Sequence, residues 1–367
     1  MSTPTSPALL WDVFCRVVDN FGDIGVCWRL ARQLGERGQR VRLWVDDAAA
    51  LRWMAPEGAP GVEVKPWLAS TIFPAPGDVV VEAFGCDPAP EFVAAMAAAE
   101  RAPAWINLEY LSAEPYVERS HGLASPQLSG PGMGLTKWFF YPGFTAATGG
   151  LLREPAQQAA QVAFDRVGWL AAQGIELRPG ERLVSLFCYP GAPVERLVAS
   201  LAADGLPALI ATAPGAATGA TRAALAASAA AGALRQHALP WFAHDDFDRL
   251  LWSADLNFVR GEDSWVRAHW AGKPFVWQAY PQDDGAHAAK VEAFVERALR
   301  GAEPAGAQPL RAWTAAWNGL APAGAELPAW TPDTLAAAGR ATLAWRDGLL
   351  ETPDLVTRLF AFVHGKR

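Results

Sequence analysis

The residues best suited to chemistry in this chain stand together at positions 260–264, Arg-Gly-Glu-Asp-Ser. An apolar run at 256–259 precedes them and a short helical pattern follows, so the segment is expected to join a buried strand to the first turn of a helix. The unpaired N–H groups and the dipole of a helix N-terminus attract anions. Glu262 and Asp263 would repel a phosphate unless they serve a sugar hydroxyl, a ribose or a developing positive charge. The pattern therefore predicts a site for a phosphate joined to a sugar.

A second acidic corner, which holds Asp19 and Asp23, follows the first apolar run of the chain, at 10–18. Strand, glycine-containing turn and helix form the first corner of nucleotide-type domains, where functional loops lie. The first glycine of the dinucleotide fingerprint is missing, and two aspartates would repel a pyrophosphate. An alternative remains open at both corners: Asp23, and Asp263 or Ser264, would then be ordinary helix caps.

A third polar segment, at 280–287, follows the expected strand at 275–277. It could be another helix N-terminus that lines a cleft, or a plain turn. His287 within it is expected to be structural.

Apolar runs alternate with amphipathic helical patterns along the whole chain, which predicts an α/β fold with parallel sheets. The first series has strands at 10–18, 41–45, 78–82 and 104–109, helices at 27–37, 90–100 and 154–172, and loops at 110–150. The second series has strands at 183–189, 207–212, 256–259 and 275–277 and helices at 194–203 and 247–253. The Ala/Gly-rich tract 213–234 is read as a poorly specified helix or a loop.

Two Rossmann-like domains are expected from these two series. The first spans 1–175 and is joined by a C-terminal helix at 347–367, and the second spans 176–346. Ligands would then bind in the cleft between them.

Composition excludes several classes of protein. A net charge of −7 argues against a nucleic-acid binder, which usually carries a basic patch. No apolar run reaches membrane-spanning length and no secretory signal is recognised, so no membrane partner is expected. The four cysteines are far apart without a C-x-x-C pair, which favours reduced core thiols in a cytoplasmic protein.

Long strings of the sequence resemble one known family, the protein-arginine rhamnosyltransferases that modify bacterial translation elongation factor P. The strings that carry the resemblance are WDVFCRVVDNFGDIGVCWRLARQL, INLEYLSAE, HGLASP, FYPGFTAATGGLLRE and DDFDRLLWSADLNFVRGEDSWVRAHWAGKPFVWQAYPQDDGAH. The resemblance implies two facing domains of the GT-B type with a central cleft. It also implies dTDP-β-L-rhamnose as donor, inversion without a metal or other cofactor, and one arginine in the N-terminal domain of elongation factor P as acceptor.

The resemblance also implies roles for single residues. Asp23 would be the catalytic base, Asp19 its essential neighbour, and Glu262 a third essential carboxylate on the donor side. The substrate-binding residues expected beside them, with Phe247 stacking on the thymine, are Asn20, Phe21, Gly22, Tyr189, His244, Phe247, Arg260, Gly261, Asp263, Ser264, Tyr280, Gln282 and Asp283.

The sequence departs from the family pattern at two places. His244 stands where a glutamine is expected to contact the base, and Pro190-Gly191 follow Tyr189 where an acidic or amide pair is expected. Both departures concern recognition of the base. The alternatives kept open are a small-molecule glycosyltransferase or sugar-nucleotide 2-epimerase of the same architecture, and a nucleotide-sugar-binding module without activity.

Overall fold

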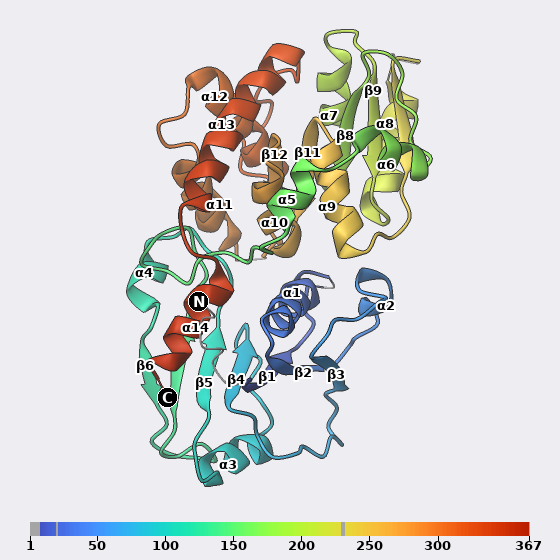
Figure 1. Cartoon of the computed structure of the whole chain (residues 1–367). Helices are drawn as coiled ribbons and strands as arrows, with labels where there is room; N and C mark the ends of the chain where they lie inside the picture. The colour runs from blue at the N-terminus through green and yellow to red at the C-terminus, as the bar shows by residue number, and fades with distance from the viewer. Residues whose placement is uncertain (1–7, 20, 229–231, 283, 367) are drawn as a thin grey trace, which may run out of the picture. The chain divides into compact units, whose positions relative to one another are not determined.

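The computed structural model describes the whole chain except residues 1–7, 20, 229–231, 283 and 367. The chain divides into two compact units (Figure 1), one of Met1–Glu154 with Thr352–Arg367, the other of Pro155–Glu351.

This division differs from the boundary expected between 175 and 176. The expected helix at 154–172 is two helices, α5 (Gln157–Val162) and α6 (Arg166–Ala172), and both pack on the second unit. Gln161 Nε2 donates a hydrogen bond to the carbonyl of Ala271 at 2.8 Å, and Trp169 Nε1 donates one to Asp246 at 3.0 Å. These contacts place the two helices with the second series of strands.

The sheet of the first unit has seven strands in the order β3-β2-β1-β4-β5-β7-β6. All neighbours pair in parallel except β6 and β7, which are antiparallel. The strands are β1 (Leu10–Cys15), β2 (Arg40–Val45), β3 (Val62–Pro66), β4 (Val79–Ala83), β5 (Ala104–Leu108), β6 (Ala124–Pro126) and β7 (Thr136–Phe140). The region 110–150, expected to consist of loops, thus contributes two strands.

The sheet of the second unit has five parallel strands in the order β10-β9-β8-β11-β12. They are β8 (Arg182–Leu186), β9 (Ala208–Thr212), β10 (Leu234–Ala238), β11 (Leu256–Arg260) and β12 (Phe275–Gln278). The Ala/Gly-rich tract forms helix α8 (Ala216–Ala227) over much of its length. The expected α/β fold with parallel sheets is confirmed in both units.

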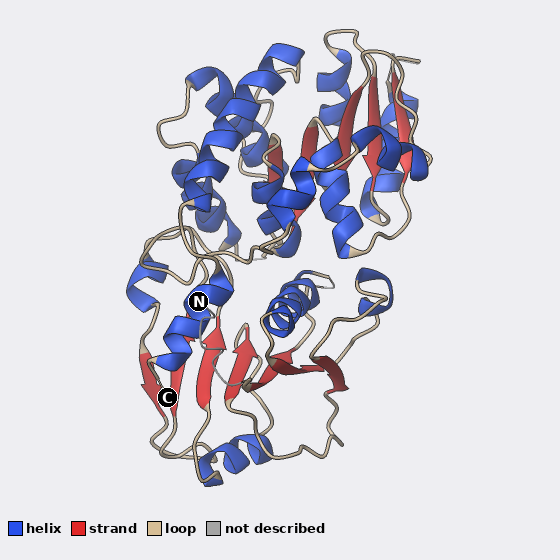
Figure 2. Ribbon diagram, viewed as in Figure 1, coloured by secondary structure: helices blue, strands red, loops and turns tan. Residues whose placement is uncertain are grey.

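Helices surround the strands of each sheet (Figure 2). The remaining helices of the first unit are α1 (Gly22–Glu36), α2 (Leu51–Met54), α3 (Pro90–Ala98), α4 (Tyr116–Ser120) and α14 (Leu355–His364). Those of the second unit are α7 (Val194–Ala202), α9 (His244–Ser253), α10 (Asp263–Ala271), α11 (His287–Ala298), α12 (Pro304–Trp317) and α13 (Pro332–Leu350). Within the described part of the chain, every helix is too short or too polar to cross a membrane.

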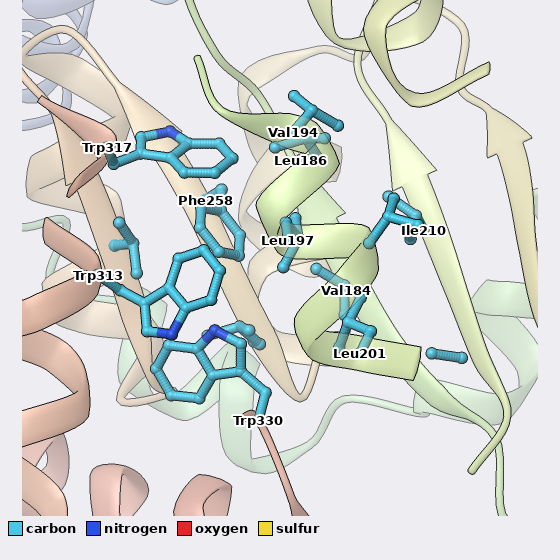
Figure 3. Packing of buried hydrophobic residues seen from close by; sticks show 14 of the residues in the cluster. Val184, Leu186, Val194, Leu197, Leu201, Ile210, Phe258, Trp313, Trp317 and Trp330 are labelled. Carbon is cyan, nitrogen blue, oxygen red and sulfur yellow. The ribbon is translucent and has the colours of Figure 1, made fainter. Parts of the chain in front are cut away.

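The main core of the second unit lies between its sheet and helices α7, α12 and α13. Trp313, Trp317 and Trp330 are each at most 1% exposed; the first two pack against Phe258 of β11, and Trp330 packs on Trp313 (Figure 3). The rings of Phe258 and Trp317 have centroids 4.3 Å apart. These contacts pack against one face of β11, so the loop that follows its carboxyl end starts from a well-packed strand.

His269 is a neutral histidine in the interior of the second unit. Burial lowers its pKa from the ordinary 6.5 to about 3, because the charged ring would lose its hydration. Its Nδ1 accepts a hydrogen bond from Trp345 Nε1 at 3.1 Å, which requires an unprotonated nitrogen.

We expect His269 to lower the stability of the folded protein as the pH decreases. Below about pH 6.5 the His269 ring binds a proton in the unfolded chain but stays neutral in the folded chain. The free energy of unfolding therefore decreases by about 1.4 kcal/mol for each pH unit of acidification. His269→Gln keeps an acceptor but does not titrate, so its urea-unfolding free energy should change less between about pH 6.5 and 5. Parallel pH curves for the two proteins would contradict this.

Candidate active site

Both sheets reverse their strand order at one point. In the first unit the chain moves from β1 outward to β2 and β3 and then returns to β4 beside β1; in the second it moves from β8 to β9 and β10 and returns to β11 beside β8. Ligands bind outside the carboxyl ends of the strands at such a switch point. Residues 16–23 and 84–87 therefore mark one candidate corner, and residues 187–191 and 260–264 the other.

The loop between β11 and α10 is fixed by backbone contacts around Gly261. Its φ of +63° is a left-handed conformation that favours glycine. Its N–H donates to the carbonyl of Gln278 at 3.1 Å, and its carbonyl accepts from Trp277 Nε1 at 2.8 Å. Trp277 in turn stacks on Trp265 of α10, with ring centroids 3.7 Å apart and an angle of 6°. The helix N-terminus is thus presented in one orientation.

Arg260, the last residue of β11, is held against two aromatic rings. Its Cζ lies 4.3 Å from the ring centroid of Phe187 and 4.2 Å from that of Tyr189. Tyr189 is fixed by its own N–H, which donates to Gln278 Oε1 at 2.8 Å, and its ring meets Tyr280 edge-on at 5.5 Å. The guanidinium is thus fixed at the carboxyl end of the sheet by contacts with aromatic ring faces.

The acidic and hydroxyl side chains of this corner are buried. Ser264 Oγ accepts a hydrogen bond from Arg260 N at 3.1 Å and donates one to the carbonyl of Arg260, so it closes the strand-to-helix turn. Asp263 Oδ2 lies 3.8 Å from His244 Nε2. The residue before helix α10 is Glu262, and its side chain makes no cap hydrogen bond. The alternative of a helix capped by Asp263 or Ser264 is therefore wrong.

Helix α9 brings His244 and Phe247 to the same corner. The ring of Phe247 is half-buried and meets Phe187 edge-on at 6.2 Å, beside Arg260. Between the two helices lies a bidentate ion pair in which Arg267 Nε and Nη2 donate to Asp248 at 2.8 and 2.7 Å. Both side chains are almost fully buried, so the pair fixes α9 against α10.

We expect Asp248→Ala to destabilise the second unit by roughly 3–5 kcal/mol, because the buried Arg267 would lose the carboxylate that accepts two of its hydrogen bonds. The matched control is Arg249→Ala, which breaks the partly exposed pair between Arg249 and Asp246 on the same helix and should change stability by under about 1 kcal/mol. Urea unfolding followed by tryptophan fluorescence measures both. Equal losses in the two variants would contradict the structural role of the buried pair.

The acidic corner of the first unit is formed by the turn before α1. Gly22 N donates to the carbonyl of Asp19 at 2.7 Å, which closes the turn. A β-carbon at Gly22 would lie 2.7 Å from Asp19 Oδ2, so glycine is required for the carboxylate to lie where it does. The residue before α1 is Phe21, which makes no side-chain cap, and Asp23 belongs to the first turn of the helix itself. The alternative of Asp23 as an ordinary cap is wrong as well.

The carboxylate of Asp23 gathers three donors. Its Oδ2 accepts hydrogen bonds from Val18 N and Asp19 N, both at 2.8 Å, and its Oδ1 accepts one from Tyr110 Oη at 3.1 Å. Asp23 is 2% exposed, whereas Asp19 is half-buried. Asp23 therefore has a structural function in the turn in addition to any role in chemistry.

The structure brings most of the expected residues into these two groups. Tyr280 and Gln282 lie on the exposed segment after β12, with Tyr280 against Tyr189. Asn20 and Asp283 lie outside the described residues. His287, expected to be structural, accepts a hydrogen bond at Nδ1 from Gln282 N at 3.4 Å.

Several contributing residues escaped the sequence analysis. They are Phe187, Gln278 and the pair of Asp248 and Arg267 in the second unit, and Tyr110 in the first. Phe187 and Tyr110 each follow the carboxyl end of a strand, and that position could have identified them. The ion pair left no such signal, because its partners belong to two helices.

Two further features bear on ligands. Among the described residues there is no group of three or more His, Cys, Asp or Glu side chains suited to a metal ion. A cleft of about 780 Å³ in the second unit is lined by Arg182, Asp255, Lys273 and Pro274, at the amino ends of β8, β11 and β12. Arg260 lies at the other end of these strands, their carboxyl end.

Comparison with known proteins identifies one family. The sequence profile of the elongation factor P (EF-P) rhamnosyltransferase EarP matches residues 11–364. The protein-arginine rhamnosyltransferase of Pseudomonas putida is 45% identical over an alignment of 330 positions, which covers 84% of this chain and 86% of that protein. The Pseudomonas aeruginosa protein of the same name is 42% identical over an alignment of 378 positions, gaps included, which covers 96% of this chain and 98% of that protein.

Solved structures agree with this assignment. A structure described as the basis for EarP-mediated arginine glycosylation of translation elongation factor EF-P has 31% identity and a TM-score of 0.65, and the match covers 98% of this chain and all of that one. A glycosyltransferase of kitacinnamycin has a TM-score of 0.51 at 16% identity, covers 96% and 97% of the two chains, and shows likeness of fold alone. The expected GT-B fold is thereby confirmed.

Proposed function

The chain belongs to the elongation factor P rhamnosyltransferase family, and we propose that it moves L-rhamnose from dTDP-β-L-rhamnose to one arginine of elongation factor P with inversion. As a member of this family it is a glycosyltransferase. The observation that carries the proposal is the pair of corners, one cationic with a helix N-terminus and one acidic, each at the switch point of its own sheet. We further propose that the acceptor arginine lies in the N-terminal domain of elongation factor P and that the reaction takes place in the cytoplasm.

The donor corner suits a nucleoside diphosphate sugar. The first N–H groups of α10 and the Arg260 guanidinium both favour the negative charge of a diphosphate. Phe247 would stack on the thymine, and His244 would contact the base beside it. Glu262 and Asp263, both buried at this N-terminus, would face the sugar and the nucleoside. Gly261, Ser264 and Tyr280 shape the same corner.

The acidic corner suits a guanidinium acceptor. The pKa of a free arginine lies above about 12, so the neutral nucleophile is scarce. As its nitrogen forms a bond to the anomeric carbon of rhamnose, the bond from that carbon to dTDP breaks and a proton on the nitrogen becomes acidic. Asp23 would accept this proton, and Asp19 would hold the guanidinium beside it. Carboxylates repel a phosphate but orient an arginine, which explains an acidic corner in a nucleotide-type fold.

Departure of dTDP needs a positive partner for the charge that develops on the diphosphate. Arg260 and the N–H groups of α10 would supply it, because donors that are held in place need no reorganisation as the charge develops. We propose that they take the place of a metal ion, and transfer that persists undiminished in EDTA would agree.

The direct test of the function incubates the protein with dTDP-rhamnose and elongation factor P. Intact mass spectrometry should show one deoxyhexose added to elongation factor P, and peptide mapping should place it on an arginine of the N-terminal domain. Transfer to small acceptors with none to the protein would point to a small-molecule glycosyltransferase. Release of a C2 epimer without transfer would point to an epimerase.

We expect Asp23→Asn to abolish transfer, with a loss of about 10²- to 10⁴-fold in kcat, because the amide cannot accept the proton. Asparagine has nearly the same shape as aspartate and should preserve the turn, so the dTDP affinity measured by calorimetry should stay as in the wild type. A variant that keeps the wild-type kcat would exclude Asp23 as the base.

We expect Arg260→Ala to weaken dTDP binding by roughly 1.5–3 kcal/mol, the range for a hydrogen bond to a charged group. Arg249→Ala removes another, partly exposed arginine of the same unit and should leave the affinity unchanged. Calorimetric titration with dTDP compares the two. Equal affinity of the Arg260 variant and the wild type would remove Arg260 from the donor site.

A further inference from the structure

An aromatic pair that the proposed mechanism does not use lies beside Asp23. We propose that Tyr110, supported by Phe84, is a positioning residue that sets the direction of Asp23 Oδ1 toward the acceptor nitrogen. This inference rests on the proposed function, in which Asp23 takes the proton. It assigns the two aromatic residues a part in the reaction that packing alone does not require.

The two oxygens of Asp23 are held in different ways. Oδ2 accepts from two backbone N–H groups, those of Val18 and Asp19, and is tied to the turn. Oδ1 accepts from the phenol of Tyr110 at 3.1 Å. A carboxylate oxygen has two lone pairs, so Oδ1 can hold the phenol with one and receive a proton on the other. Only 2% of Asp23 is exposed, so an acceptor can approach from few directions and the angle of Oδ1 is decisive.

Tyr110 needs support because it lies beyond the carboxyl end of β5 and is partly exposed. It follows β5 by two residues and is 39% exposed. Phe84 provides the support, since the two rings are nearly parallel, at 10°, with centroids 4.2 Å apart. β4 and β5 are neighbours with Ala83 opposite Leu108, so the two aromatic residues leave adjacent strand ends. β1 lies on the other side of β4 and leads to Asp23.

Phe84 adopts a backbone conformation that a bulky residue rarely takes. Its φ is +59°, and the next residue, Gly85, has a φ of +66°. A left-handed pair of residues at a strand end is made most easily by two glycines. A phenylalanine strained in this way persists only where the surroundings fix it, and such strain gathers at functional sites. Its N–H donates to the carbonyl of Leu108 at 2.6 Å, which locks the turn.

A purely structural role explains these observations less well. Tyr110 and Phe84 are both partly exposed, so their stacking buries little area. The strained backbone of Phe84 works against stability. The arrangement does deliver one phenol hydrogen to one oxygen of Asp23, and a small misplacement of a reacting group lowers rates by about 10²-fold.

The test compares variants that remove one element of the support at a time. Tyr110→Phe removes the hydroxyl and keeps the ring; Phe84→Leu keeps a side chain at the strained position but removes the aromatic plane; Phe84→Tyr keeps the plane. Steady-state kinetics with elongation factor P give kcat and KM, and calorimetry gives dTDP affinity. Tyr116→Phe is the matched control, since Tyr116 is another tyrosine of the first unit and is 41% exposed.

We expect Tyr110→Phe to lower kcat by roughly 10- to 100-fold, with acceptor KM and dTDP affinity within about twofold of the wild type. Phe84→Leu should also lower kcat. Phe84→Tyr and Tyr116→Phe should keep the wild-type kcat. Adding Tyr110→Phe to Asp23→Asn should cause no further loss, because residues that act as one unit are not additive. Circular dichroism checks that each variant is folded.

Two results would overturn the inference. If Tyr110→Phe keeps the wild-type kcat while Asp23→Asn is inactive, Asp23 is the base but the phenol does not position it. If Tyr110→Phe raises acceptor KM at unchanged kcat, Tyr110 binds the acceptor instead. A different outcome, full activity of Asp23→Asn, would reject the base assignment itself and is recognised without the Tyr110 variants.

Discussion

The rest of the structure depends on one feature of each parallel sheet, the point at which the order of its strands reverses. Connections that leave the two strands at a switch point run to opposite sides, so the carboxyl ends between them stay uncovered. In the first unit this place lies between β1 and β4, and in the second between β8 and β11. The same constraint therefore creates two open corners, and the residues of the loops decide what each corner binds. One is cationic with a helix N-terminus; the other is acidic.

The cationic corner is held by contacts within the second unit. Arg260 lies against two rings, Gly261 is tied at both its N–H and its carbonyl, and the Asp248–Arg267 pair fixes helix α9 against α10. Groups that stabilise a leaving diphosphate act best when they need no reorganisation as charge develops. A buried ion pair need not make a fold more stable than a pair of apolar residues would, even though removing one partner is costly. Its value lies in holding α9, which carries Phe247, against α10.

The acidic corner combines a structural and a chemical demand on one side chain. Asp23 closes the turn through Oδ2, and only Oδ1 is left to serve a reacting partner. The strained Phe84 beside Tyr110 is consistent with this demand, because a fold built for stability alone would place glycine there. Asp19, less buried than Asp23, is the carboxylate that an approaching guanidinium meets more easily.

Much of the fold followed from local pattern. The alternation of apolar runs and helical periods predicted both parallel sheets, and the polar segments after the first strand and after β11 predicted both corners. The roles of single residues came from resemblance to a family. The expected loops at 110–150 contain β6 and β7, because β7 gains its place by pairing with β5 and carries little pattern of its own. Helices α5 and α6 joined the second unit through contacts with distant segments.

The sequence by itself determined which chemical groups stand at strand ends, since strand, loop and helix signals are local. Only the tertiary structure decided which of those groups meet. The phenol of Tyr110 reaches Asp23 across 87 positions of the chain, and Arg260 finds Phe187 and Tyr189 on a neighbouring strand end. Such contacts depend on strand order and register, which are set by the packing of the whole sheet and not by any single segment.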